Sequence, residues 1–412
     1  MRVWAARSAL AFVVAATLAA CGSNPAPPAP PPPSTPPPGL IAAPVQVPDE
    51  LAQDPLDQPR QALIPAGWTI EVIARVPKAR MAAFAPDGAL LVSVPATGQV
   101  LTVRPEQRIL LDGLEQPHGL FFAGSTLYVA ESNRVDAYDY VDGRAVNRHT
   151  VAGGLPDAKS PELHGAYSHA LKSVVVGSDG AVYFSIGSTG NVSAEDRNAT
   201  PPRATIMRVP PGGGPAAPFA TGVRNGTGLA LAPDGTLWTA VNNRDNVPDP
   251  QGRVRQDYVD DHPPESVAKV TPGRELGWPY CNPDGPPPAG FIRDMETNAD
   301  GSKMDCAALA PVEQTLGAHA APLGMSFGEL PRYGLGALVG VHGSWNRQTP
   351  QAPEVSFFGW RNGTLGPQQT LVGGFQDDDG TRWGRPVAAV VGPDGAVYVT
   401  DDYAGAVYRL AP

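Results

Sequence analysis

A histidine beside a predicted β-hairpin is placed where it could do acid–base chemistry. Two apolar runs, residues 172–177 and 181–186, are separated by Ser178-Asp179-Gly180, a turn sequence whose glycine can take a positive φ. His169 precedes the first run and the loop 187–191 follows the second, so antiparallel pairing brings both to one edge of the sheet. An imidazole there could act as a general base near neutral pH, or it could be an ordinary polar loop residue.

Further polar residues lie in loops that we expect to follow the inner strands and to gather at one end of the fold. They are Arg224-Asn225, Asn242–Asp245, His319, His342–Arg347, Gly384-Arg385-Pro386 and Asp401-Asp402. Each alone is typical of a surface ion pair. Together they indicate a pocket for a polyanionic ligand and a cation. Arginine binds carboxylates through two parallel hydrogen bonds, and Asn, Asp and backbone oxygens suit Ca²⁺.

A repeated unit predicts the fold that positions these loops. It consists of a strand, a turn resembling Pro-Asp-Gly and a second strand, with copies at residues 84–92, 122–129, 176–184, 231–239 and 391–399 and a degenerate copy at 336–341. Six copies predict an all-β, six-bladed β-propeller, because closing such units into a ring removes the exposed sheet edges. We expect the C-terminal strand near residues 406–410 to close the ring with an N-terminal strand. A β-sandwich is the structural alternative, but it does not explain such regular copies.

The N-terminal segment predicts export. Residues 1–20 have the basic start and apolar run of a signal peptide, and Leu18-Ala19-Ala20-Cys21 resembles the bacterial lipoprotein cleavage box, in which Cys21 is lipidated. A plain signal peptide is the alternative. Residues 21–49 read as the lipidated Cys and a Pro-rich spacer, and 50–412 as the propeller, with an insertion at about 246–320. We therefore expect a lipid-anchored protein on the periplasmic side of a bacterial membrane, the outer membrane in our interpretation.

Cysteine content and charge narrow the possibilities further. Cys281 and Cys306 are an even pair in an oxidising compartment, so we expect a disulfide across the insertion, worth about 3 kcal/mol on loop-entropy grounds. The net charge is −10 and no basic run is present. This argues against nucleic acid as the partner.

Five motifs resemble the glucose/sorbosone dehydrogenase family and its sorbosone-dehydrogenase-like branch. They are Arg224–Leu229, Leu276–Tyr280, Gly317–Pro322, Gly343–Arg347 and Gly384–Pro386, and the resemblance extends over about residues 60–411. It implies a six-bladed propeller that uses pyrroloquinoline quinone (PQQ) and Ca²⁺. It also implies that His169 is the general base. Ser188 stands where the glucose enzymes have an Asp that orients this base.

The resemblance implies roles for the remaining polar residues as well. The residues matched to cofactor contacts are Arg224, Asn225, His319, Arg347 and Arg385, with Arg80 as a possible substitute for a stacking Gln that corresponds to Ala89. Asn243 and Arg244 match residues whose backbone carbonyls bind the cofactor-bound Ca²⁺, and Asp245 is a plausible side-chain ligand.

The sequence thus predicts a quinoprotein dehydrogenase that oxidises an aldose, a sorbosone-like aldehyde or a related polyol and passes electrons to an acceptor that it does not identify. One alternative is a non-catalytic propeller lipoprotein that binds a glycan or a protein. Another is a Ca²⁺-dependent lactone hydrolase, which is less consistent with these Arg-rich loops.

Overall fold

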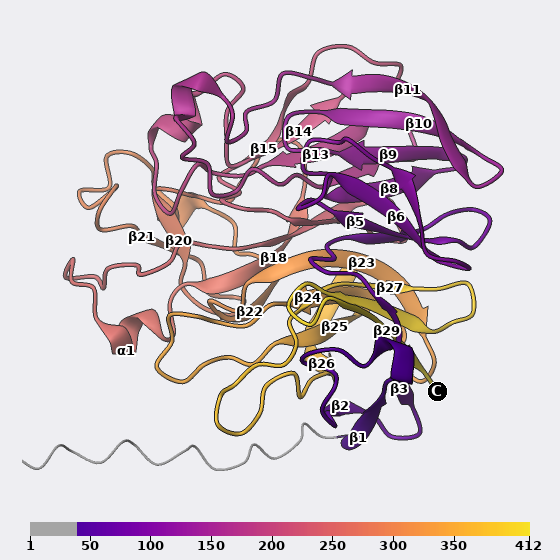
Figure 1. The fold of residues 1–412 in the computed structure, drawn as a ribbon. Helices are drawn as coiled ribbons and strands as arrows, with labels where there is room; N and C mark the ends of the chain where they lie inside the picture. The colour runs from indigo at the N-terminus through magenta and orange to yellow at the C-terminus, as the bar shows by residue number, and fades with distance from the viewer. Residues whose placement is uncertain (1–38) are drawn as a thin grey trace, which may run out of the picture.

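Six sheets, each with four blade strands, follow one another along the chain in the computed structural model, which describes residues 39–412 (Figure 1). Two of these sheets carry additional strands. The first strands of neighbouring sheets pack against each other around a central axis, so the sheets are the blades of a propeller. The predicted all-β, six-bladed fold is confirmed.

The strands of each blade are named in their order from the axis outward. Blade 1 contains β4 (Ala82–Phe84), β5 (Leu90–Val94), β6 (Gln99–Arg104) and β7 (Arg108–Leu111); blade 2 contains β8 (Gly119–Ala123), β9 (Thr126–Ala130), β10 (Val135–Val141) and β11 (Arg144–Ala152); blade 3 contains β12 (Val174–Val176), β13 (Val182–Ile186), β14 (Thr205–Val209) and β15 (Ala217–Thr221). Blade 4 contains β16 (Gly228–Leu231), β17 (Leu237–Val241), β18 (Pro264–Val270) and β22 (Gln314–Ala318); blade 5 contains β23 (Pro322–Leu330), β24 (Gly334–Val341), β25 (Glu354–Arg361) and β26 (Thr364–Val372); blade 6 contains β27 (Pro386–Val391), β28 (Val397–Asp401), β29 (Ala406–Ala411) and β3 (Thr69–Arg75).

Small residues let the first strands approach one another at the axis. A Cβ atom on Gly119 would lie 2.7 Å from the Cα atom of Ser173, and one on Gly324 would lie 2.7 Å from the Cβ atom of Ala388. Because both gaps are shorter than any normal contact, these positions require glycine.

The ring closes as the sequence predicts. The N-terminal strand β3 pairs antiparallel with the C-terminal strand β29, with Ile70 opposite Leu410. The alternating apolar residues of β3 face the core of blade 6, where Ile70 and Val72 are both buried. Closure therefore joins the two ends of the described chain in one sheet.

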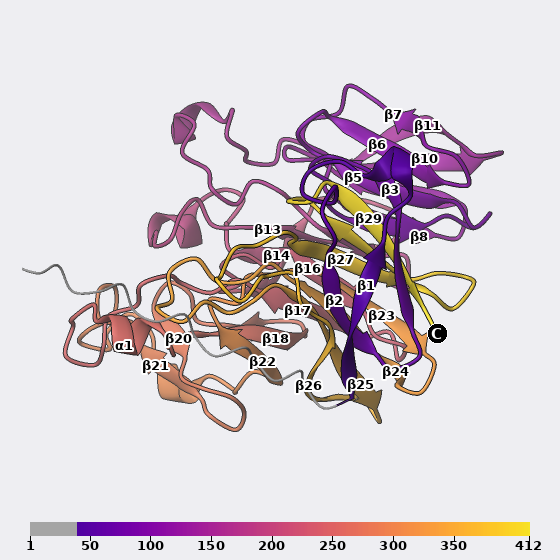
Figure 2. The same cartoon turned by 60° about the horizontal axis from the view of Figure 1, so that its bottom comes forward.

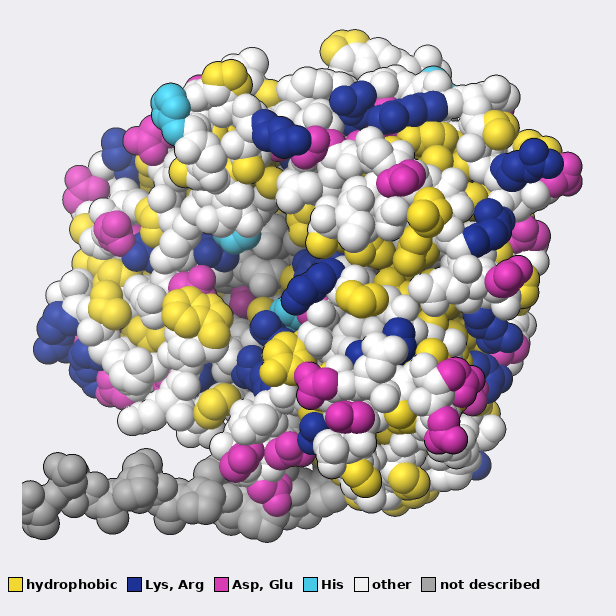
Figure 3. Space-filling view, viewed as in Figure 1, with side chains coloured by type: hydrophobic (Ala, Val, Ile, Leu, Met, Phe, Trp, Pro, Cys, Tyr) yellow, Lys and Arg dark blue, Asp and Glu magenta, His cyan; other side chains and the backbone are white. Residues whose placement is uncertain are grey.

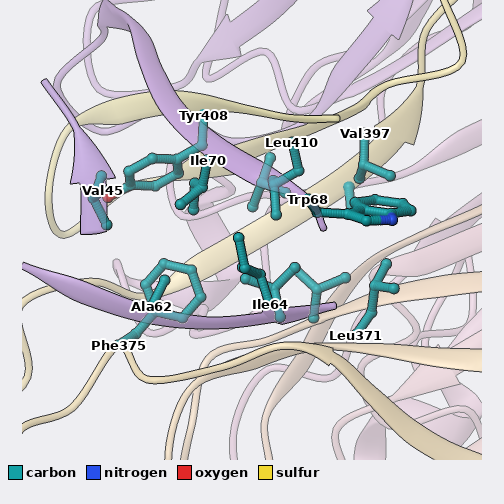
Figure 4. Close-up of a cluster of buried hydrophobic side chains, with 14 of the residues drawn as sticks. Val45, Ala62, Ile64, Trp68, Ile70, Leu371, Phe375, Val397, Tyr408 and Leu410 are labelled. Carbon is teal, nitrogen blue, oxygen red and sulfur yellow. The ribbon is translucent and has the colours of Figure 1, made fainter. Parts of the chain in front are cut away.

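The folded domain begins earlier than predicted. Strand β1 (Leu40–Gln46) lies within the segment expected to be spacer, but it pairs with β2 (Gln61–Pro65) and β3. Figure 4 shows Val45, Ala62 and Ile64 packed with apolar residues of blade 6 and with Leu371 of β26. Burial of these apolar side chains overrides the Pro- and Ala-rich composition, so the predicted start near residue 50 is about ten residues too late. A short 3₁₀ turn, Asp49–Leu51, connects β1 to β2.

The predicted insertion at 246–320 is two loops separated by a blade strand. The α1 loop (242–263) connects β17 to β18 and contains helix α1 (Gln256–Val259). The disulfide loop (271–313) connects β18 to β22 and contains β19 (Arg274–Glu275), β20 (Cys281–Pro283) and β21 (Phe291–Arg293). The prediction missed β18 and β22 because they follow no Pro-Asp-Gly turn.

Both loops project from the same side of the propeller. Helix α1, β20 and β21 lie away from the blades in Figure 1 and again after the rotation in Figure 2. Strand β19 pairs parallel with β15, so the disulfide loop also reaches blade 3. Cys281 and Cys306 form a disulfide in this loop, with their Cα atoms 5.7 Å apart. No helix within residues 39–412 is long and apolar enough to cross a bilayer.

Candidate active site

The polar residues gather at one face of the ring. They lie just before the first strand or just after the second strand of each blade: His169 precedes β12, Ser188 follows β13, and Arg224 precedes β16. Antiparallel pairing of these two strands places both kinds of loop on the same face. The space-filling view shows a hollow near the centre of the molecule with Arg or Lys, acidic and His side chains around it (Figure 3).

His169 is held by the loop that follows β13. Its Nδ1 atom lies 2.9 Å from the hydroxyl oxygen of Ser188 and 3.0 Å from the Ser188 carbonyl oxygen. The carbonyl can only accept a hydrogen bond, and the Ser188 hydroxyl donates its own proton to the carbonyl of Gly190 at 2.7 Å. Both contacts therefore require Nδ1 to carry the imidazole proton, which leaves the lone pair on Nε2.

The environment keeps His169 neutral. Burial lowers the pKa of His169 to about 3, and the nearby Arg224 guanidinium acts in the same direction. Asn225 shares this edge of the site, because a Cβ atom on Gly187 would lie 2.6 Å from the Cβ atom of His169 and 3.1 Å from the Asn225 side-chain oxygen. Glycine at position 187 thus allows His169 and Asn225 to lie against the same strand end.

Arg224 is buried in a shell of acceptors from two loops. It donates to the Asn243 carbonyl at 2.7 Å and to the Asn191 side-chain oxygen at 2.9 Å, and its ion pair with Asp245 is 3.3 Å long. Asn191 also accepts from the Asp245 backbone N–H at 2.8 Å. Arg224 therefore fixes the loop after β13 to the loop after β17, which bounds the His169 side of the site.

A second cluster of cations lies between blades 5, 6 and 1. The imidazole Nε2 of His342 is 2.7 Å from one carboxylate oxygen of Asp402, and Arg80 donates to the other at 2.8 Å. Arg385 donates through Nε to the His342 carbonyl at 2.9 Å, and Arg382 donates to the Ser344 carbonyl. Burial, and then repulsion from Arg382, lower the pKa of Arg385. Asp402 therefore faces an excess of positive charge.

The two clusters are connected through the segment before β23. The backbone N–H of His342 donates to the Ala321 carbonyl at 3.0 Å. The Ala321 N–H in turn faces a carboxylate oxygen of Glu265 at 3.4 Å, and the other oxygen of Glu265 accepts from the Asn243 N–H. The base and the cation cluster thus belong to one network on one face.

Comparison with known proteins identifies the family. The TrAA12-like family matches residues 63–412. The chain belongs to the TrAA12-like family. The PQQ domain of pyranose dehydrogenase from Coprinopsis cinerea has a similar structure, with a TM-score of 0.72 and 20% identity over 86% of this chain and 97% of that one. A calcium structure of the family AA12 enzyme from Trichoderma reesei has a TM-score of 0.70 and 20% identity over 85% and 96%.

A curated relative supports the same family. The PQQ-dependent pyranose dehydrogenase of Coprinopsis cinerea is 25% identical in an alignment of 325 residues that covers 66% of this chain and 42% of that protein. The TrAA12-like chain therefore spans less than half of that longer protein. The family predicted from the motifs is confirmed, although these relatives are named for pyranose and not for sorbosone.

Several predicted residues of the TrAA12-like chain do not contact the cation cluster. Both ring nitrogens of His319 are engaged, Nε2 with the Val259 carbonyl at 2.8 Å and Nδ1 with Asp245 at 3.4 Å, so His319 has no free nitrogen for a cofactor. Arg347 lines a cleft bordered by the α1 loop, the disulfide loop and β22 of blade 4, where it approaches the Ala318 carbonyl at 3.4 Å. His319 and Arg347 depart from the expected geometry because the α1 loop packs against both. Its residue Val259 contacts His319, and its residue Asp260 contacts Gln348, next to Arg347.

The cofactor PQQ fits the cation cluster. Arg382 lies close enough to Arg385 to lower the pKa of Arg385. Among residues 39–412, Asp402 is the carboxylate that pairs with Arg80. No acceptor within the described chain contacts the two terminal nitrogens of Arg385. A ligand with several carboxylates supplies the missing negative charge.

Calcium does not fit its predicted ligands as they are arranged. The Asn243 carbonyl accepts from Arg224, and the Asp245 carboxylate lies between Arg224 and His319. The Arg244 side chain pairs with Asp294 in the disulfide loop, so only its backbone carbonyl remains as a predicted ligand. Within residues 39–412 no group of three or more His, Cys, Asp or Glu residues could hold a metal.

Four polar residues of the site had no individual role in the prediction, although His342 and Asp402 were among the expected pocket residues. Asn191 contacts Arg224, His342 contacts Arg385 and Asp402 contacts Arg80. Arg382 contacts the Ser344 carbonyl. Asn191, His342 and Asp402 stand in loops whose polar residues predict a pocket. The sequence does not predict which residues they contact. Glu265 lies inside β18, a strand that the repeat did not reveal.

Proposed function

We propose that this chain oxidises a sugar or a sugar-derived alcohol or aldehyde with PQQ as cofactor and His169 as general base. The observation that carries the proposal is the His169–Ser188 contact, which leaves a basic Nε2 atom on the same face as the cation cluster. The structural relatives include PQQ-dependent sugar dehydrogenases, which supports sugar oxidation in general.

The residues that would bind the cofactor and the residue that accepts the proton lie on two sides of the site. Arg385, Arg382 and Arg80 would hold the carboxylates of PQQ, which when bound would supply a two-electron acceptor for hydride from the carbon that bears the reacting hydroxyl. His169 Nε2 takes the hydroxyl proton, and Ser188 holds the ring so that Nε2 faces the substrate. The low pKa of His169 keeps this atom unprotonated before the reaction, and the charge of Asp245 favours the imidazolium that forms.

Reconstitution tests this function. The purified chain is loaded with PQQ and Ca²⁺, and reduction of an electron-accepting dye is followed across a panel of aldoses, polyols and L-sorbosone. We expect dye reduction with at least one sugar. PQQ binding without turnover of any substrate, or no PQQ binding, contradicts the proposal.

We further propose that Ca²⁺ binds together with PQQ, which requires a rearrangement of the predicted ligands. Arg224 must release the Asn243 carbonyl before this oxygen can bind a cation. A titration of PQQ at increasing Ca²⁺ tests this step: a PQQ affinity that rises with Ca²⁺ supports it, and a PQQ affinity independent of Ca²⁺ contradicts it.

We also propose export and lipidation at Cys21, which lies outside the residues that the structure describes. In a bacterial host, the wild-type chain should incorporate labelled palmitate and sediment with membranes. Cys21→Ser should lose both properties, and wild-type protein without label would contradict lipidation.

A non-catalytic propeller is not favoured. A site for a glycan or protein alone does not require a histidine with a fixed tautomer or several half-buried arginines close to one another.

A further inference from the structure

Two aromatic side chains are exposed on the face that carries the candidate site. Among residues 39–412, seven large hydrophobic side chains are exposed, and only Trp345 and Tyr403 of these are aromatic. Trp345 is 70% exposed and Tyr403 is 53% exposed. Trp345 follows β24 and Tyr403 follows β28, the second strands of neighbouring blades. The five aliphatic members lie elsewhere, on β1, β7, β10, β11 and the α1 loop.

The cation cluster connects the loops that carry these aromatics. His342 and Asp402, joined by the 2.7 Å hydrogen bond, are three residues before Trp345 and one residue before Tyr403. Arg382 donates to the carbonyl of Ser344, the residue immediately before Trp345. The aromatics therefore stand at the rim of the proposed cofactor site and not on a remote surface.

The backbone around Trp345 is fixed although its side chain is not covered. Gln256 of helix α1 donates to the Asn346 carbonyl at 2.8 Å, and the Gln348 N–H donates to Asp260 at 3.0 Å. On the other side, the Ser344 N–H donates to the Gln351 carbonyl at 3.1 Å. A rigid support holds an indole in water, where its apolar surface is unfavourable unless a ligand covers it.

We propose that Trp345, together with Tyr403, is a stacking platform for the second pyranose ring of an extended sugar whose first ring is oxidised at His169. This inference rests on the proposed function and adds an oligosaccharide as the substrate class. Pyranose rings with equatorial substituents present flat faces of C–H groups, which pack well on an aromatic face. The exposed side-chain amide of Gln348, three residues after Trp345, can bind sugar hydroxyl groups.

A sugar fits this rim better than a protein does. Protein interfaces bury at least about 1,000 Å² around an apolar centre. Here two separate aromatic rings stand among polar residues, including Asn346, Gln348 and Asp402. This pattern matches the small, amphipathic surface of one sugar ring.

Steady-state kinetics of the reconstituted enzyme tests the platform. Glucose, cellobiose and cellotriose are compared in the wild type, Trp345→Ala, Trp345→Phe, Tyr403→Ala and Val254→Ala, an exposed aliphatic control on the α1 loop. Trp345→Ala should raise KM for cellotriose about tenfold more than KM for glucose, with a smaller difference, about threefold, for Tyr403→Ala. Trp345→Phe should restore most of the discrimination, and Val254→Ala should show none. An unchanged ratio in Trp345→Ala overturns the proposal, as does a change confined to KM for the electron acceptor, which would indicate protein docking.

A binding measurement separates failure of the platform from failure of the redox function. The other Trp side chains within residues 39–412 are buried or half-buried, so Trp345 dominates the exposed indole fluorescence. Cellotriose should change the tryptophan emission of the cofactor-free chain, and Trp345→Phe should abolish this change. If no sugar is oxidised but the emission changes, the platform stands and the redox function fails. If sugars are oxidised and the emission does not change at millimolar cellotriose, the platform fails.

Discussion

The Nδ1 atom of His169 lies 2.9 Å from the Ser188 hydroxyl oxygen, and that hydroxyl donates its own proton to the Gly190 carbonyl. This chain of contacts determines which imidazole nitrogen is basic. A hydroxyl orients the ring as a carboxylate would, but it provides no negative charge to stabilise the imidazolium.

Removal of the Ser188 hydroxyl should therefore slow the reaction without preventing it. In Ser188→Ala the Ser188 carbonyl still accepts from Nδ1, so we expect kcat to fall by about tenfold with little change in KM. Ser193→Ala, in the same loop but half-buried and without a contact to His169, is the matched control. A loss of PQQ affinity in Ser188→Ala would indicate that Ser188 contacts the cofactor instead.

Arg385 should determine cofactor affinity. Arg385→Met removes two free terminal nitrogens from the cation cluster, and we expect PQQ affinity to fall by about one hundredfold, as for loss of a charge-assisted pair. Arg208→Met, on the outer strand β14, should leave PQQ affinity unchanged. Equal affinities of Arg385→Met and wild type in a PQQ titration would exclude the cluster as the carboxylate site.

Glu265 should make folding stability depend on pH. Burial raises the pKa of Glu265 to about 7, above the ordinary value of 4.5. The folded state therefore holds a proton that the unfolded state has lost, so this contribution is full below pH 4.5 and disappears as the pH rises through about 7. Urea unfolding at pH 4.5 and 8 should show a smaller decrease in stability for Glu265→Gln than for wild type. Glu50→Gln, on the exposed 3₁₀ turn, should behave like wild type, and a wild-type slope in Glu265→Gln would refute the assignment.

The disulfide should stabilise the loop that borders the site. Cys281 and Cys306 are 25 residues apart, so we expect Cys281→Ser/Cys306→Ser to lose about 3 kcal/mol of unfolding free energy. Because Arg244 links this loop to the loop after β17, PQQ affinity should also decrease. Comparable urea midpoints for the double variant and the oxidised wild type would contradict this expectation.

The sequence predicted local features well and long-range partners poorly. The Ser178-Asp179-Gly180 turn, where Gly180 has φ +83°, and the pairing of β3 with β29 follow from local patterns and from the need to close a sheet edge. The position of β1 does not, because burial of Val45 depends on residues far away in blade 6.

The candidate site shows the same division. His169 and Ser188 are predicted together because one hairpin joins them. His342 and Asp402 are 60 residues apart and meet only because two blades are neighbours. The interactions that occupy His319 and Asp245 likewise depend on the α1 loop, for which the repeat gives no register.

One comparison tests the central claim most directly: PQQ-loaded wild type and His169→Gln, mixed with the best substrate of the sugar panel and followed by the absorbance of the bound quinone. We predict that both bind PQQ with similar affinity and that the wild type is reduced at least about a thousandfold faster, since His169 is the base that accepts the hydroxyl proton. Reduction of His169→Gln at the wild-type rate would contradict the assignment of His169, and wild-type protein that binds no PQQ would contradict the account as a whole.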